Sequence, residues 1–157
     1  MGVVSDTHMP SRAREIPGAL AERLRTVDVI LHAGDLTTVA VLREFERLAP
    51  VMAVSGNVDE EALWKLLPRT RTVALGGFRV GIVHGDGGGP STIERARRAF
   101  EGVDCIVFGH SHAPTVEHYR STLMVNPGSP TDPRRQPRPS FAILTIEQEI
   151  RAEIVYL

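Results

Sequence analysis

The chain has 157 residues, of which 42% are hydrophobic and 24% charged, and its formal net charge is −1. This length predicts one domain over residues 1–157, and the balanced charge excludes a general attraction to nucleic acid or anionic membranes. No apolar stretch approaches the roughly 18 residues that span a bilayer, and the chain opens directly on a strand, so we expect no membrane span or signal peptide. The single cysteine, Cys105, lies in an apolar run, which predicts a buried thiol in a cytoplasmic protein.

The first half of the chain alternates short apolar strands with amphipathic helices. The predicted strands are residues 1–5, 29–31 and 51–54, and the predicted helices are residues 16–27, residue 39 to just before Pro50, and residues 60–67, which Pro68 ends.

The second half is richer in strands. Residues 73–82 alternate with period two around Gly76-Gly77, which predicts a β-hairpin. Ser91 and Glu94 have the spacing of a capping box and predict a helix that ends near Phe100. Five further strands are predicted at residues 105–108, 116–119, 123–125, 141–146 and 150–156. This order of elements predicts an α/β fold with two mixed β-sheets flanked by helices, a four-layer αββα sandwich.

Residues with metal-binding side chains follow five of the predicted strands. They are Asp6 and His8, Asp35, Asn57, His84, and His110 with His112. Each has an ordinary explanation alone, as a turn residue, a helix cap or a surface histidine. In open α/β sheets, however, ligands bind at the carboxyl ends of the strands, so the full set indicates a site for two metal ions. Mixed oxygen and nitrogen ligands suit manganese, iron, zinc, nickel or cobalt.

Other polar residues have two interpretations each. Asn126-Pro127-Gly128-Ser129 either supports the site or forms a tight turn, and Arg134, Arg135 and Arg138 either clamp a phosphate or lie in a solvated loop. His32 is interpreted as a buried, hydrogen-bonded histidine of the core.

The ordered motifs resemble the calcineurin-like metallophosphoesterase superfamily, and the motif at Asn126 resembles its small prokaryotic YfcE-like phosphodiesterase branch. The motifs are Asp6-Thr7-His8, Gly34-Asp35, Gly56-Asn57, His84 and Gly109-His110-Ser111-His112. The resemblance implies the αββα sandwich and two divalent ions, with Mn²⁺ the expected metal and Ni²⁺, Co²⁺, Fe²⁺ and Zn²⁺ as alternatives. It implies that one ion is held by Asp6, His8, Asp35 and His112, and the other by Asp35, Asn57, His84 and His110. Asp35 would bridge the ions, and Asp35, Asn57 and His110 are also assigned to catalysis.

Three features depart from that family pattern. Val58 stands where many members carry a histidine after the site asparagine, so it removes a candidate general acid. Asp86 stands where relatives often show a second histidine after His84. The first strand begins abruptly, which predicts a loosened anchor for Asp6.

The resulting hypothesis is a metal-dependent phosphodiesterase that hydrolyses a small phosphodiester by in-line attack of a metal-bridging hydroxide. Nucleic acid is expected only as a substrate, and the oligomeric state is open, with a homo-oligomer as one option. The alternative function is a catalytically weak protein-interaction scaffold of the same fold, like the retromer subunit. The complete ligand set favours the enzyme.

Overall fold

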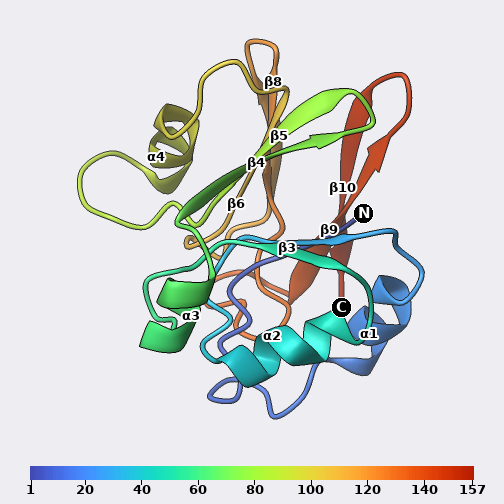
Figure 1. Ribbon diagram of the computed structural model, residues 1–157, viewed down its shortest axis with the longest axis vertical. Helices are drawn as coiled ribbons and strands as arrows, with labels where there is room; N and C mark the ends of the chain where they lie inside the picture. Colours follow the sequence, from blue (N-terminus) through green and yellow to red (C-terminus); the bar gives the residue numbers. More distant parts are fainter.

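The computed structural model describes residues 1–157 and contains two five-stranded β-sheets (Figure 1). The strand order of the first sheet is β10-β9-β1-β2-β3. Its strands are β1 (Gly2–Val4), β2 (Ile30–His32), β3 (Val51–Ala53), β9 (Ser140–Ile146) and β10 (Ile150–Tyr156). β1, β2 and β3 run parallel, and the terminal hairpin of β9 and β10 adds to β1 in the antiparallel sense.

The second sheet has the order β4-β5-β6-β8-β7 and is also mixed. Its strands are β4 (Thr70–Leu75), β5 (Phe78–Val83), β6 (Cys105–Phe108), β7 (Thr115–Tyr119) and β8 (Thr122–Asn126). β5, β6 and β8 are parallel to one another, whereas β4 and β7 pair antiparallel at the two edges. The two sheets together therefore supply six parallel strands, and five of these precede the predicted site residues.

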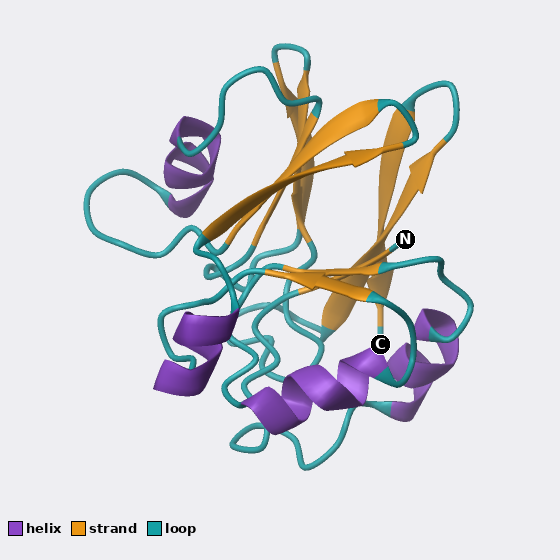
Figure 2. Ribbon diagram, in the orientation of Figure 1, coloured by secondary structure: helices purple, strands orange, loops and turns teal.

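Four helices cover the outer faces of the sheets (Figure 2). They are α1 (Gly18–Leu24), α2 (Val39–Glu46), α3 (Glu61–Leu66) and α4 (Thr92–Arg98). Leu24 of α1, Phe45 of α2 and Leu63 of α3 pack in one cluster against the first sheet. Ala96 of α4 packs with Ile106 and other residues of the second sheet. The predicted four-layer αββα sandwich is confirmed.

Period-two alternation in the strands divides their side chains between layers. Val3 and Leu31 face the core between the two sheets, whereas the adjacent Val4 and Ile30 face the helices. In β6, Val107 faces the core between the sheets and Ile106 faces α4. These strands are buried on both faces, which explains why they appear in the sequence as short, continuous apolar runs.

Two predictions about helices need correction. The first helix is shorter than residues 16–27, because Pro17 is its N-cap and Arg25 its C-cap. Ser91 makes no side-chain capping bond, and Glu94 instead pairs with Arg97 and Arg98 one turn later. Charge-assisted bonds to arginine are stronger than the neutral bond of a capping box, so the arginines take the carboxylate.

The anchor of Asp6 is not loosened. The Met1 ammonium donates to the Leu144 carbonyl at 2.7 Å, and the Gly2 amide donates to the Val29 carbonyl at 3.0 Å. Pairing with the neighbouring strands therefore fixes the short first strand. Asp6, which follows this strand, is fully buried.

Two further findings concern features predicted from composition. Cys105 is fully buried, and burial raises the pKa of its thiol to about 12. None of the four helices has the length and apolar character needed to cross a bilayer.

His32 is a buried core histidine, as predicted, but its hydrogen bonding is incomplete. The ring lies edge-on to Phe45, with 5.3 Å between centroids. Its Nε2 lies 3.4 Å from Thr7 Oγ1, whereas its Nδ1 has no hydrogen-bond partner. Burial disfavours the charged ring and lowers the pKa of His32 to about 3.

His32 should therefore weaken the fold in acid. As the pH falls below the ordinary value of 6.5, the unfolded chain binds a proton that the folded chain refuses until about 3. Stability is thus lost at up to about 1.4 kcal/mol per pH unit in that window. Urea unfolding of the protein and of His32→Gln, near pH 7 and near pH 5 in EDTA, should show a larger loss for the unaltered protein. Equal losses would mean that His32 titrates normally inside the fold.

Candidate metal centre

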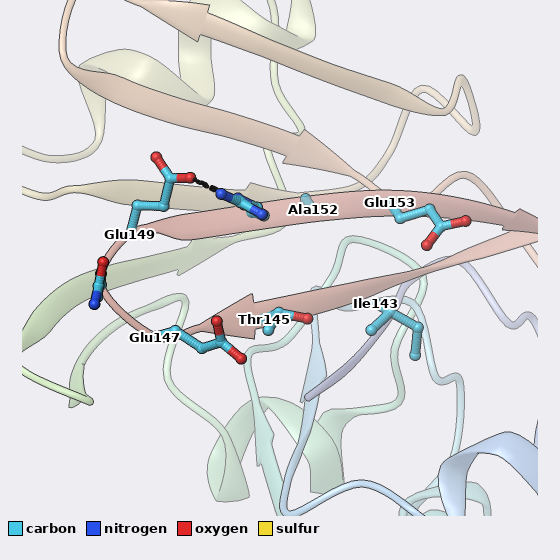
Figure 3. Close-up of a pocket in the computed structure, with 8 residues that line it drawn as sticks. Ile143, Thr145, Glu147, Glu149, Ala152 and Glu153 are labelled. Atoms are coloured by element: carbon cyan, nitrogen blue, oxygen red, sulfur yellow. Dashed lines mark hydrogen bonds and ion pairs between the residues drawn. The ribbon is translucent and has the colours of Figure 1, made fainter.

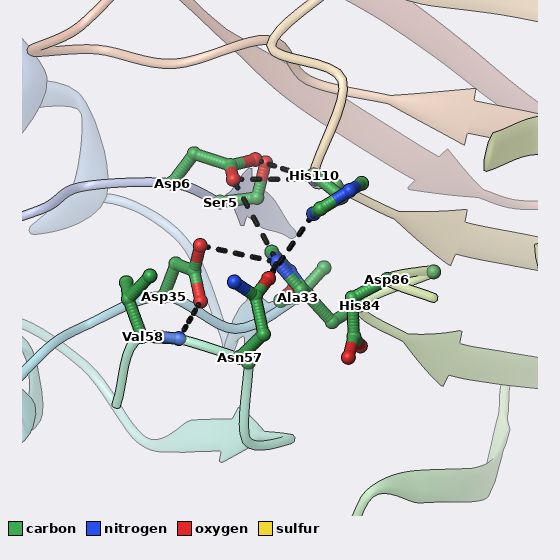
Figure 4. Close-up of polar contacts among 12 residues, drawn as sticks. Ser5, Asp6, Ala33, Asp35, Asn57, Val58, His84, Asp86 and His110 are labelled. Atoms are coloured by element: carbon green, nitrogen blue, oxygen red, sulfur yellow. Dashed lines mark hydrogen bonds and ion pairs between the residues drawn. The ribbon is translucent and has the colours of Figure 1, made fainter. Parts of the chain in front are cut away.

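The predicted site residues lie where strands of both sheets end. In the first sheet, β1 leads to Asp6 and His8, β2 leads to Asp35, and β3 leads to Asn57. In the second sheet, β5 leads to His84, and β6 leads to His110 and His112. Figure 4 shows Asp6, Asp35, Asn57, His84 and His110 converging from separate segments. The structure brings all seven predicted residues together.

Asp6, His8 and His112 form one half of the cluster. Their ligand-type atoms all lie within 4.8 Å of one another. Asp6 Oδ1 lies 3.3 Å from His112 Nε2 and 3.8 Å from His8 Nε2, and the two Nε2 atoms are 3.2 Å apart. Two imidazole nitrogens and a carboxylate oxygen that converge in this way form a suitable donor set for a borderline divalent cation.

The other half contains Asp35, Asn57, His84 and His110. His84 Nε2 lies 3.1 Å from Asp35 Oδ2 and 3.1 Å from Asn57 Oδ1. Asn57 Oδ1 also lies 3.1 Å from His110 Nδ1, and the rings of His84 and His110 are edge-on, with centroids 5.2 Å apart. This half therefore offers oxygen and nitrogen donors from four different loops.

The two halves meet at the carboxylates. Asp35 Oδ2 lies 3.6 Å from His8 and 3.1 Å from His84, so one oxygen faces both halves. Asp6 Oδ1 is also central, because it lies 4.0 Å from His84 in addition to its contacts in the first half. The sequence predicted a position between the two halves for Asp35 alone. It did not predict that Asp6 also lies between them.

The two halves differ in exposure. His8, His84, His112 and both carboxylates are buried, whereas Asn57 is exposed and His110 is partly exposed. The centre is therefore open to solvent on the side of Asn57 and His110.

The carboxylates are ionised although they are buried. Burial raises the pKa of Asp6, but hydrogen bonds to His112 and His8 outweigh burial and hold that pKa well below its usual range. Burial likewise raises the pKa of Asp35, and the hydrogen bond to His84 reverses the shift. No lysine or arginine side chain lies within 4.0 Å of either carboxylate. Buried charge needs a partner, so the positive charge must come from protonated imidazole or from a bound cation.

Two of the histidines are fixed with Nε2 facing the centre. His84 Nδ1 is 2.8 Å from the Ala33 carbonyl, and His112 Nδ1 is 2.5 Å from the Asp132 carbonyl. An Nδ1 that donates to a carbonyl leaves the Nε2 of a neutral ring as a lone pair, which is the usual arrangement of a metal-bound histidine. The lone pair of His84 would then face two oxygen acceptors, which is unfavourable without a cation between them.

Without a cation, a proton takes that place on His84. Burial lowers the pKa of His84, but the Asp35 hydrogen bond and the charges of Asp6 and Asp35 outweigh burial and raise the pKa to about 9. The cluster thus attracts positive charge even without metal, and metal binding would displace this proton. The donor set, its orientation and its charge all fit divalent metal ions.

The backbone at the site is unusual. Eight residues other than glycine have positive φ, and five of them are predicted metal ligands. These five are Asp6 (φ 54°), His8 (44°), Asp35 (59°), His110 (66°) and His112 (57°). Such conformations cost about 1–3 kcal/mol each and concentrate at functional sites. The positions of these side chains are therefore maintained against local backbone preference.

Glycine is required where the ligand loops touch. A Cβ added at Gly56 would lie 2.0 Å from Asp35 Oδ1, and one added at Gly34 would lie 2.9 Å from His84 Nδ1. The glycines that precede Asp35 and Asn57 therefore allow two loops to approach within a distance that no side chain permits.

The segment after β8 supports the site from behind. Asn126 Nδ2 donates to the Gly109 carbonyl at 2.9 Å, and its Oδ1 accepts from the Gly128 amide, so this motif forms a tight turn that also supports the site. Ser129 Oγ donates to the Asp6 carbonyl at 2.7 Å, and the Asp132 carbonyl fixes His112. These bonds hold ligands from two different sheets.

The arginines after this segment are engaged elsewhere or exposed. Arg134 lies 3.7 Å from the Asp132 carboxylate, Arg138 donates to the Leu157 carbonyl, and Arg135 is exposed. None contacts the predicted ligands, so their contacts favour the interpretation of a solvated loop.

Sequence reasoning missed several supporting residues. Asp59 accepts from the amides of Gly56 at 2.7 Å and Thr37 at 2.6 Å, and therefore holds the turn that carries Asn57. An acidic residue three positions after a turn glycine is a recognisable signal for such a bond. The carbonyls of Ala33 and Asp132 gave no signal, because every residue has a carbonyl.

A broad hollow elsewhere, over the hairpin of β9 and β10, contains none of the site residues (Figure 3). Its lining includes Glu147, Glu149 and Glu153, and the one arginine there, Arg151, is paired with Glu149. This acidic surface would repel an anionic ester.

Comparison with known proteins agrees with this geometry. Residues 1–149 match the family described as the calcineurin-like phosphoesterase superfamily domain. A probable metallophosphoesterase of Methanothermobacter thermautotrophicus is 42% identical over 99% of this chain and 91% of its own length.

Solved structures extend the similarity. A structure described as a novel archaeal phosphodiesterase is 26% identical, with a TM-score of 0.77 over 98% of each chain. Vps29 of Entamoeba histolytica, solved in complex with zinc, is also 26% identical, with a TM-score of 0.76 over 99% of this chain and 97% of its own. By the match over nearly its whole length, the chain belongs to the calcineurin-like phosphoesterase superfamily.

Proposed function

We propose that this member of the superfamily is a dinuclear, metal-dependent phosphodiesterase. The observation that carries the proposal is the pair of buried, ionised carboxylates, Asp6 and Asp35, which imidazoles surround and no lysine or arginine neutralises. One ion would be held by Asp6, His8, Asp35 and His112, and the other by Asp35, Asn57, His84 and His110. Asp35 would bridge the two, and Asp35, Asn57 and His110 would border the reacting ester.

Two bound divalent ions would lower the pKa of a bound water and polarise the phosphoryl oxygens of an ester. The chain itself orients the donors. Asp35 is fixed by the Val58 amide, which donates to its Oδ1 at 3.1 Å, and Asp6 is fixed by the His110 amide at 2.9 Å. Because the centre is open beside Asn57 and His110, an ester would enter from that side and meet these residues first.

The charge of the centre favours an anionic substrate. Two divalent ions carry four positive charges and the two aspartates return two negative ones, so the loaded site keeps a positive charge that attracts a phosphodiester. A small phosphodiester substrate, manganese as the metal and a cytoplasmic location remain predictions.

The similarity to Vps29 keeps a protein-interaction scaffold as the alternative function. Because that protein was itself solved with zinc, metal binding alone does not distinguish an enzyme from a scaffold of this fold. The complete donor set favours the enzyme, and only turnover decides between the two functions.

Metal-stripped protein should hydrolyse bis(p-nitrophenyl) phosphate only after Mn²⁺ is added. The reason is that the chain supplies ligands at the centre and no nucleophile of its own. Release of p-nitrophenolate, measured before and after the addition, tests this. Folded protein that shows no turnover with Mn²⁺, Ni²⁺ or Co²⁺ would favour the scaffold.

Replacement of the bridging residue should remove both ions. Asp35→Ala is expected to lose both, because Asp35 Oδ2 faces His8 and His84, whereas Asp6→Ala should lose only the ion of His8 and His112. Metal content per folded chain, measured by mass spectrometry after dialysis, separates the variants. If Asp6→Ala loses both ions and Asp35→Ala keeps one, Asp6 is the bridge.

The rate should depend steeply on the leaving group. Val58 is 44% exposed beside the centre, and it cannot supply the proton that a histidine would donate. Figure 4 shows the Val58 side chain beside the Asp35 carboxylate. Methyl p-nitrophenyl phosphate should be hydrolysed faster than methyl phenyl phosphate, because an acidic leaving group departs without a proton. General acid catalysis is commonly worth about 10²–10⁴-fold.

Val58→His is the matched variant for this comparison. The added imidazole should raise the rate for the less acidic leaving group more than for p-nitrophenolate. Equal rates for both esters in the unaltered protein would contradict the prediction.

A further inference from the structure

The role of Asp86 is not explained by the metal ligands, yet its side chain is engaged. Asp86 follows His84 by two residues, and both of its carboxylate oxygens accept from Arg69 Nη2, at 2.6 and 2.5 Å. Arg69 lies between α3 and β4, close in sequence to neither Asp86 nor His84. The Asp86 carboxylate is therefore held by an ion pair at the edge of the centre.

The same guanidinium reaches the loop that carries Asn57. Arg69 Nη1 donates to the Gly56 carbonyl at 3.1 Å. One side chain thus joins the loop after β3 in the first sheet to the loop after β5 in the second. The only other polar contact between these loops is the one between the predicted ligands themselves, Asn57 Oδ1 and His84 Nε2.

The carbonyl of the peptide group before Asn57 is held by two donors. Trp64 Nε1 also donates to the Gly56 carbonyl at 2.9 Å, so two donors use its lone pairs. The Gly56 amide, which belongs to the preceding peptide group, donates to Asp59. The orientation of these two peptide groups sets the direction in which the Asn57 side chain leaves the backbone.

From these contacts we propose that Arg69 and Asp86 are positioning residues that fix the distance between Asn57 and His84. This inference rests on the proposed metal centre and assigns a role to the Asp86 departure. Arg69 and Asp86 act as one unit, because the planar guanidinium is the only group outside the two loops that bonds both of them.

Two other roles for this pair are less consistent with the contacts. An arginine that binds substrate phosphate would present an uncompensated charge, but Asp86 neutralises this one. A role in global stability would be small, because the Arg69 side chain is 54% exposed and exposed ion pairs contribute little. A positioning role therefore predicts a large effect on metal affinity and a small effect on the melting temperature.

Calorimetric titration of metal-free protein with Mn²⁺ tests the proposal. In Arg69→Gln and in Asp86→Asn, the dissociation constant of the ion held by Asn57 and His84 should rise about 10–100-fold, the usual cost of losing an outer-shell contact. The other ion should bind as before. The double variant should lose no more than the single variants, because the two residues form one unit.

Two controls assign the effect. Arg43→Gln breaks an exposed ion pair on α2, away from the centre, and should leave both affinities unchanged. Asn57→Ala should remove the second ion directly, and adding Arg69→Gln to it should not weaken the remaining ion further.

Hydrogen exchange of the metal-free protein gives a readout that needs no metal. Exchange in Arg69→Gln should be faster for residues 55–58 and 84–87 and unchanged for residues 6–8. Unchanged affinity and exchange, or a lower melting temperature with both affinities intact, would overturn the proposal. If the unaltered protein binds only one ion, the dinuclear centre fails instead, and the exchange comparison alone decides on the positioning role.

Discussion

The structure is organised around two negative charges that have no permanent positive partner. Asp6 and Asp35 are buried where two sheets meet, and the imidazoles of His8, His84 and His112 lie within 4.0 Å of them. Removing an ion from water costs several kcal/mol even after the protein relaxes, and a lone carboxylate at this position would simply bind a proton. Asp6 and Asp35 remain ionised because hydrogen bonds from imidazoles favour the charged form of each carboxylate. Backbone carbonyls hold two of these imidazoles in place. The surrounding loops can be understood as the means of holding these groups in place.

Much of this arrangement could be predicted because its rules are local. Each ligand follows an apolar strand by one to four residues, and strands buried on both faces are visible in the sequence as short apolar runs. Parallel strands bring their carboxyl ends to one edge, so the position of a ligand in the sequence predicted its position in space. His84 and His110 were placed in the right region by this rule alone, without knowledge of which sheet carried them.

The remaining features depend on contacts that a sequence does not display. The Ala33 and Asp132 carbonyls fix two histidines, but a carbonyl acquires a role only when the fold places it beside a ring. Ser91 and Glu94 had the spacing of a capping box, and two arginines on the next turn competed successfully for the glutamate. Arg69 joins two loops whose strands belong to different sheets, and no sequence spacing announces such a contact. In each case a partner distant in sequence, or stronger than the local one, decided the outcome.

The unequal exposure of the centre has a kinetic consequence. His8 and His112 are buried, and the segment after β8 holds His112 through the Asp132 carbonyl, whereas Asn57 and His110 face solvent. If the centre holds two ions as proposed, the ion in the buried half would leave only when that segment opens or after the outer ion has left. Loading should then be sequential, with the inner position filled early and exchanged slowly. The protein would spend much of its time with the inner ion retained, and the supply of the outer ion would set how many molecules are active.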